Sequence, residues 1–134
     1  MEKTFAMIKP RAVAEHHTGK IIDMIETAGF TIAGLKKIHM SREQAQCLYQ
    51  EHAEKPFFPG MVDIITSTPV VVMVLKKDNA VKAWRDLMGA TNPAQADAGT
   101  IRALFGVNID HNATHGSDSL SSAKREMDIF FPEL

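Results

Sequence analysis

This sequence of 134 residues has one cysteine, no marked excess of one charge and no long apolar run. Each of these features excludes a class of protein. The single cysteine, Cys47, cannot form an internal disulfide and has no partner for a cysteine-rich zinc site, so we expect a reducing, cytoplasmic location. No stretch approaches the ~20 apolar residues that a transmembrane helix needs, so no membrane association is expected. Glu2 and Pro10 interrupt the N-terminal segment before any long apolar run develops, unlike in a signal peptide.

The charges of the chain nearly balance, with 15 basic and 16 acidic residues and a formal net charge of −1. Such a chain has no overall positive field for binding nucleic acid, so any anion site must be local. The length and the 45% hydrophobic content are typical of one globular domain that buries its own core. No repeat, low-complexity segment or linker is present, and we predict a single domain over residues 1–134.

Apolar periodicity predicts the first elements of the chain. Strands are predicted over residues 4–8, where Pro10 ends the strand, and over residues 30–38. Between them, a helix is predicted to have Thr18 as its N-cap and to end at Gly29. The apolar stripe of this helix comprises Ile21, Ile22, Ile25 and Ala28.

The middle of the chain predicts one more helix and the clearest strand. Ser41 is expected to cap the helix, and KPFFPG at residues 55–60 is expected to break it. The apolar face of this helix comprises Ala45, Leu48 and Tyr49. The run PVVVMVL at residues 69–75 is continuous and β-branched, as expected of a strand covered on both faces or at the centre of a sheet.

A third helix and a long loop follow that strand. Asp78 or Asn79 should cap the helix and Gly89 should end it. Its buried stripe comprises Val81, Trp84 and Met88. Residues 89–111 have the composition of a loop with one short helical turn at residues 100–105, and so long a loop in a small domain is usually functional.

Helical spacing returns at the end of the chain, with Asp118 or Ser119 as the cap and with His115 on a short strand just before it. The stripe of this last helix comprises Leu120, Ala123, Met127 and Phe131. The order of elements predicts an α+β fold with a ferredoxin-like βαββαβ core. In it, a four-stranded, mostly antiparallel sheet is covered by helices on one face.

The segment NATHGSDS, residues 112–119, contains an imidazole that no aliphatic run would bury. The following helix N-terminus favours negative charge through its free N–H groups, so a phosphate could rest there. On an ideal helix, Glu126 falls roughly 90° from the centre of the apolar stripe, from where its carboxylate can turn towards His115. A carboxylate bonded to one imidazole nitrogen leaves the other free to attack an electrophile, and Ser117 could hold that carboxylate. Alternatively, His115 is only a polar residue in a turn and Glu126 is solvated.

Four motifs are far more specific together than any one residue. They are TFAMIKP, HAEKPFFPGMV, GATNPAQADAGTIRALF and NATHGSDS, at residues 4–10, 52–62, 89–105 and 112–119. By the order and spacing of these motifs, the sequence resembles the nucleoside diphosphate kinases along essentially its full length. The resemblance implies a ping-pong reaction in which a nucleoside triphosphate, typically ATP, phosphorylates a histidine and a nucleoside diphosphate then takes the phosphoryl group.

The resemblance also assigns roles to residues. His115 is the implied nucleophile through Nδ1, Glu126 its orienting carboxylate and Ser117 the serine bonded to that carboxylate. The implied contacts of the base are Phe57 and Met61, and those of the ribose are Lys9 and Asn112. The implied contacts of the phosphates are Arg85, Thr91 and Arg102. Tyr49 and His52 are implied to lie near the transferred group. The resemblance also places Lys9 and Tyr49 among the catalytic residues, together with His115, Glu126 and Ser117. Mg²⁺ is expected to arrive with the nucleotide phosphates rather than on a protein site. Stacking on Phe57 would accept any base, which predicts broad base specificity.

Each of these residues also has a purely structural interpretation. Lys9 alone would be a solvated lysine at a strand end, Phe57 and Phe58 would be core aromatics, and Arg85 would be a surface charge. Tyr49 alone would be a half-buried amphipathic ring. Only the joint occurrence of the motifs favours the functional interpretation.

Three other functions are less well supported. His111 and His115 have the i, i+4 spacing of zinc ligands, and two histidines stand at 16–17, but the segment is not predicted to be helical and the chain has one cysteine. A sheet of this topology can bind nucleic acid, but the aromatic pair follows a helix and no basic face is evident. A catalytically silent scaffold would not need to keep the whole set of site residues.

The sequence departs from the family pattern at a few positions. Leu104 replaces a common acidic residue, Arg11 and Ala12 replace a frequent Asp-Gly or Asn-Gly, and Met61 replaces a usual aliphatic residue. None of these changes removes an implied functional group. The chain ends at FPEL, earlier than is usual in the family, where further residues help to make subunit contacts. We expect a homo-oligomer, with a tetramer favoured over a hexamer and a dimer possible.

Overall fold

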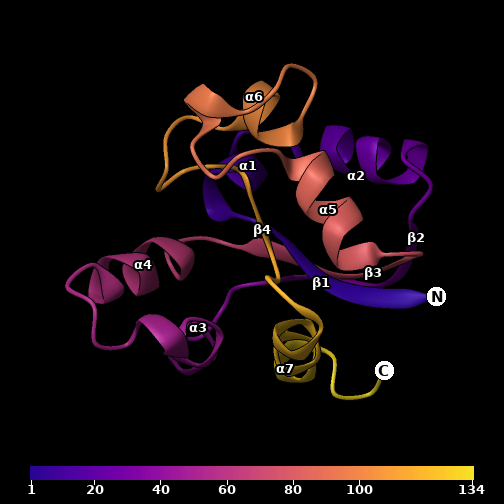
Figure 1. Ribbon diagram of the computed structural model, residues 1–134. Helices are drawn as coiled ribbons and strands as arrows, with labels where there is room; N and C mark the ends of the chain where they lie inside the picture. The colour runs from indigo at the N-terminus through magenta and orange to yellow at the C-terminus, as the bar shows by residue number, and fades with distance from the viewer.

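Four strands form one sheet in the computed structural model, which describes residues 1–134 (Figure 1). The strands are β1 (Glu2–Ile8), β2 (Thr31–Ile38), β3 (Val70–Lys77) and β4 (Thr114–Gly116), in the spatial order β2-β3-β1-β4. Each neighbouring pair is antiparallel, and a bulge interrupts the β2–β3 register. The predicted α+β fold is confirmed, and its sheet is wholly antiparallel.

The strands are connected by helices, most of which were expected from the sequence. They are α1 (Pro10–Ala14), α2 (Thr18–Thr27), α3 (Arg42–Leu48), α4 (Phe58–Ile65), α5 (Ala80–Met88), α6 (Ile101–Phe105) and α7 (Leu120–Phe130), with 3-10 turns η1 (Gln50–His52) and η2 (Pro93–Gln95). No helix has both the length and the apolar character needed to cross a membrane.

Helices cover both faces of the sheet, so the predicted coverage of one face was wrong (Figure 1). Phe5 and Met7 of β1 point into one core with residues of α3, α4 and α7. Ala6 and Ile8 point into the other core, with residues of α1, α2, α5 and α6. Side chains of β3 alternate between the same two cores, which explains why residues 70–75 are apolar without interruption.

The motif KPFFPG was misinterpreted as a helix breaker. α3 already ends at Leu48, and Phe58 begins a new helix, α4, with a proline in its first turn. A proline is tolerated there because the first N–H groups of a helix have no partner within it. Pro10 likewise begins the short helix α1, which the sequence did not predict.

Two details of the predicted helices were also wrong. Thr18 is the first residue of α2, and His17 occupies the N-cap position without a side-chain hydrogen bond. In α7, Leu120 is 60% exposed, whereas Glu126 is 2% exposed, so the buried face is rotated towards the carboxylate. The predicted caps Ser41 and Ser119 are confirmed, since each side chain accepts a hydrogen bond from a backbone N–H of its helix.

Candidate active site

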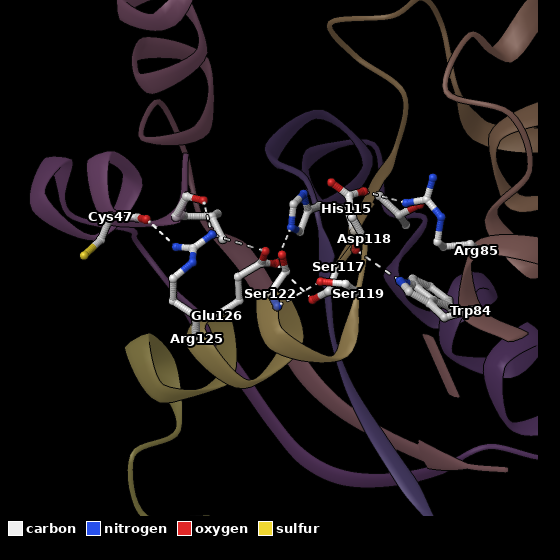
Figure 2. Close-up of polar contacts among 12 residues, drawn as sticks. Cys47, Trp84, Arg85, His115, Ser117, Asp118, Ser119, Ser122, Arg125 and Glu126 are labelled. Carbon is white, nitrogen blue, oxygen red and sulfur yellow. Dashed lines mark hydrogen bonds and ion pairs between the residues drawn. The ribbon is translucent and has the colours of Figure 1, made fainter. Parts of the chain in front are cut away.

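His115 lies on β4 opposite Met7 of β1, and its ring is oriented by a carboxylate from α7. Its Nε2 is 2.8 Å from Glu126 Oε1, and Ser117 Oγ donates to the same oxygen over 3.1 Å (Figure 2). An ionised carboxylate only accepts, so Nε2 carries the proton and Nδ1 keeps a lone pair. Nδ1 makes no hydrogen bond, and the side chain is 17% exposed. This nitrogen can therefore act as a nucleophile.

Apolar rings and a backbone hydrogen bond fix the position of His115. Phe5 lies 5.9 Å from the imidazole between ring centroids, and Tyr49 contacts it edge-on at 5.8 Å. The Trp84 indole N–H donates to the backbone carbonyl oxygen of His115 over 3.2 Å. The imidazole is thus held both through its ring and through its main chain.

The implied ribose contacts form one hydrogen-bonded group beside β4. Lys9 Nζ donates to Asn112 Oδ1 over 2.8 Å, and Asn112 Nδ2 donates to the Thr91 carbonyl oxygen over 3.0 Å. The Lys9 N–H also donates to the Ala113 carbonyl oxygen, which joins the end of β1 to the segment before His115. Burial, with a smaller contribution from the Arg102 charge, lowers the pKa of Lys9 to about 8. The interpretation of Lys9 as a freely solvated lysine is therefore wrong.

The two implied phosphate-binding arginines have different surroundings. Arg102 is 8% exposed, and its guanidinium donates to the carbonyl oxygens of Gly89 and Thr114 over 3.0 Å each. Burial first, and the Arg85 charge second, lower the pKa of Arg102 to about 10. Arg85 is exposed and pairs with Asp118 at 2.8 Å. A surface hollow of 470 Å³ lies beside Arg85 but does not reach the imidazole of β4.

The segment from the end of α3 to α4 contributes the remaining predicted residues. Tyr49 is buried, and burial followed by the Glu126 charge raises the pKa of its phenol. His52 lies between Tyr49 and Phe57, with ring centroids 6.5 Å and 5.8 Å away, and its Nδ1 is buried without a partner. The Phe57 ring is 52% exposed, so it is no core aromatic. Met61 packs against the core under α3 and α4.

The structure adds residues that the sequence did not single out for the site. Trp84 was predicted only as a core residue, although an indole N–H usually finds a partner when buried. Asp118 was considered only as a helix cap. Ala113 has φ +74, a left-handed conformation that is sparsely populated by residues other than glycine and that no sequence signal predicts.

Comparisons with known proteins show the family of the chain. The family model described as Nucleoside diphosphate kinase matches residues 2–134. The chain belongs to the nucleoside diphosphate kinase family. As a member of that family, it is a phosphotransferase.

Similar proteins cover nearly the whole chain. The nucleoside diphosphate kinases of Geotalea uraniireducens and Geobacter sulfurreducens are 54% and 52% identical, each over 100% of this chain and 98% of the relative. A crystal form of the Aquifex aeolicus nucleoside diphosphate kinase has a TM-score of 0.95 at 38% identity, covering 97% of this chain and 94% of that one. The Halobacterium salinarum enzyme, solved in complex with CDP, has a TM-score of 0.95 at 40% identity, covering 98% and 88%.

Proposed function

We propose that this enzyme moves the terminal phosphoryl group of a nucleoside triphosphate, typically ATP, to a nucleoside diphosphate through phosphorylated His115. The observation that carries the proposal concerns the two nitrogens of the His115 ring. Nε2 is hydrogen-bonded to Glu126, whereas Nδ1 makes no hydrogen bond and the side chain is partly exposed. In the first half-reaction, the Nδ1 lone pair attacks the γ-phosphorus. The bond from that phosphorus to the β,γ-bridging oxygen breaks, and the nucleoside diphosphate leaves.

The second half-reaction reverses these steps with another nucleotide. A terminal β-phosphate oxygen of the incoming diphosphate attacks phosphorus, the N–P bond breaks, and its electron pair returns to Nδ1 of His115. The imidazole is positively charged while it carries the phosphoryl group, and the buried Glu126 carboxylate stabilises that charge through the Nε2 proton. A phosphoramidate has a transfer potential comparable to that of the phosphoanhydride, so both half-reactions are close to balanced.

The surrounding residues support a nucleotide bound between two segments of the chain. The exposed face of Phe57 can stack on any base, which supports broad base specificity. Lys9 and Asn112 present an ammonium and an amide for the ribose hydroxyls. Arg85 and Arg102 bring positive charge to the phosphates, and binding would draw Arg85 away from Asp118. A nucleotide in the related Halobacterium salinarum structure also supports this assignment.

Mg²⁺ fits this site as a companion of the nucleotide. The one carboxylate bonded to His115 is that of Glu126, and no group of three or more histidine, cysteine, aspartate or glutamate side chains could hold a metal ion. When bound with the nucleotide, Mg²⁺ would neutralise negative charge that develops on the phosphates. Arg85, Thr91 and Arg102 would hold the remaining phosphate oxygens.

The proposal is tested by incubating the enzyme with γ-labelled ATP and Mg²⁺ in the absence of an acceptor. We expect an acid-labile, alkali-stable label that an added nucleoside diphosphate removes. His115→Ala should form no label and lower turnover at least roughly 10⁴-fold, because the nucleophile is lost. His111→Ala, which removes a histidine four residues earlier, is the control and should label normally. A His115→Ala enzyme that keeps a tenth of the activity would contradict the proposal.

A further inference from the structure

The guanidinium of Arg125, the residue before Glu126 on α7, lies between two elements of the site. Its Nη1 donates to the Cys47 carbonyl oxygen over 2.7 Å, and its Nη2 donates to the Leu48 carbonyl oxygen over 3.4 Å. Nη2 also lies 3.6 Å from Glu126 Oε2 (Figure 2). One side chain of α7 therefore joins the end of α3 to the carboxylate that orients His115.

The contacts of the Glu126 carboxylate are unequal at its two oxygens. Oε1 accepts from both His115 and Ser117, whereas Oε2 makes no hydrogen bond and has only the Arg125 charge beside it. The side chain is 2% exposed, so little water can reach Oε2. A buried carboxylate stays charged only where cations or donors compensate for the lost water. The other ionisable groups facing it are His115 and the phenol of Tyr49, and neither supplies a permanent positive charge.

The partners of Arg125 on α3 hold the guanidinium in place. The carbonyl oxygens of Cys47 and Leu48 stand at the C-terminal end of α3, where the regular hydrogen bonds of the helix interior end. A cation is favoured there by the partial negative charge of the helix end. Tyr49, which contacts the His115 ring, follows directly on this end. The position of the guanidinium is thus fixed by the same segment that packs on the imidazole.

We propose that Arg125 is a positioning residue for phosphoryl transfer. It holds the Glu126 carboxylate in the orientation in which Oε1 accepts the hydrogen bond from Nε2 of His115. This inference rests on the proposed function of His115 as the phosphoryl acceptor. Arg125 lies on the side of Glu126 away from His115 (Figure 2), so we expect it not to contact the nucleotide. Its effect should therefore appear in the rate of phosphorylation and not in nucleotide affinity.

The kinetic test compares Arg125→Met, Arg125→Lys and the control Lys124→Met. Lys124 precedes Arg125 on α7 and is exposed. We expect Arg125→Met to slow labelling of His115 by MgATP roughly tenfold or more, as expected for loss of an interaction with a charged group, with KM changed less than about twofold. Arg125→Lys keeps the charge and should recover part of the rate, and Lys124→Met should match the native enzyme. An Arg125→Met rate within twofold of native, or Arg125→Lys no faster than Arg125→Met, would overturn the inference.

A second measurement does not depend on catalysis. In ¹⁵N NMR spectra of the imidazole, native His115 should be protonated at Nε2, and Arg125→Met should show a mixture with the Nδ1-protonated tautomer. An unchanged tautomer in Arg125→Met contradicts the inference. If Arg125→Met does not fold, Arg125→Gln replaces it in both measurements, since it can still donate to Cys47 but carries no charge. A native enzyme that forms no label on His115 would refute the proposed function instead, so the two failures are distinguishable.

Discussion

Lys9 combines a polar role at the site with an electrostatic cost to the fold. Its ammonium is partly buried near another cation, Arg102, and only the more weakly acting Asp110 opposes the resulting decrease of its pKa to about 8. An unfolded lysine has a pKa of 10.5. Between these two values, the folded chain binds fewer protons than the unfolded chain, so the contribution of Lys9 to stability increases with pH. The cost is fully present below pH 8 and is relieved as the pH rises towards 10.5.

The direction of this pH dependence predicts how the stability of Lys9→Met differs from that of the native enzyme. Relative to that variant, the native enzyme should gain free energy of unfolding between pH 8 and pH 10, because only the native enzyme has the buried amine to deprotonate. Urea unfolding of both proteins at several pH values measures the difference. Lys20→Met, which removes an exposed lysine of α2, serves as the control. If the free energies of unfolding of the native and Lys9→Met enzymes change with pH in the same way, the pKa of the Lys9 amine is not lowered by the fold.

Single residues of the site were predictable where a motif or a helical period constrained them. The pairing of His115 with Glu126 followed from the spacing on α7, and the structure shows it. The bonds of Trp84 to a backbone carbonyl oxygen and of Arg125 to α3 were not predictable, because each joins segments far apart in sequence. Exposure was also hard to predict, since Phe57 and Leu120 are apolar but largely exposed.

β4 is the shortest strand, and its packing against α5 depends on a glycine. It has three residues, and a Cβ at Gly116 would lie 2.5 Å from Met88 Cε and 2.5 Å from Trp84 Cδ1. Both side chains are buried, so neither can move away freely. The absent side chain lets α5 approach closely enough for its indole to reach the His115 carbonyl oxygen.

Gly116→Ala should therefore reduce both stability and activity. Overpacking should cost about 1–3 kcal/mol of unfolding free energy, and a displaced β4 should slow labelling of the imidazole that it carries. Gly60→Ala is the matched control. A Cβ at Gly60, in the first turn of α4, meets nothing within 4 Å. Chemical denaturation and the label-transfer rate are the measurements. If Gly116→Ala has the unfolding free energy and the label-transfer rate of the native enzyme, β4 can accommodate the additional methyl group.

Helices and strands were predicted best where one period dominated. The residue patterns of β3 and α5 are of this kind, and both elements agree with their predictions within two residues. α4 was missed because its first turn contains Phe, Pro and Gly, and only the tertiary packing of Val62 and Ile65 makes it a helix. The coverage of both sheet faces was implied by the continuous apolar run of β3, but the assumed topology led to the one-face prediction.

The assembly state is a property of the whole molecule, and a homotetramer remains our prediction. β2 is an outer strand of the sheet, and its Leu35 is 46% exposed. An outer strand with exposed apolar side chains is a frequent site of association, and a net charge of −1 offers little repulsion between copies. Light scattering after size-exclusion chromatography at micromolar concentration should give four times the mass of one chain. A mass of one, two or six chains would rule out the tetramer.

The position of β1 between β3 and β4 has a consequence for how the enzyme is made. Its first strand acquires its second neighbour only when Thr114–Gly116 is available, more than a hundred residues later in the chain. Such distant pairing is slow to form compared with local contacts. The imidazole that we propose as the phosphoryl acceptor therefore joins the sheet last, after the sequence of both β1 and β3 has been synthesised.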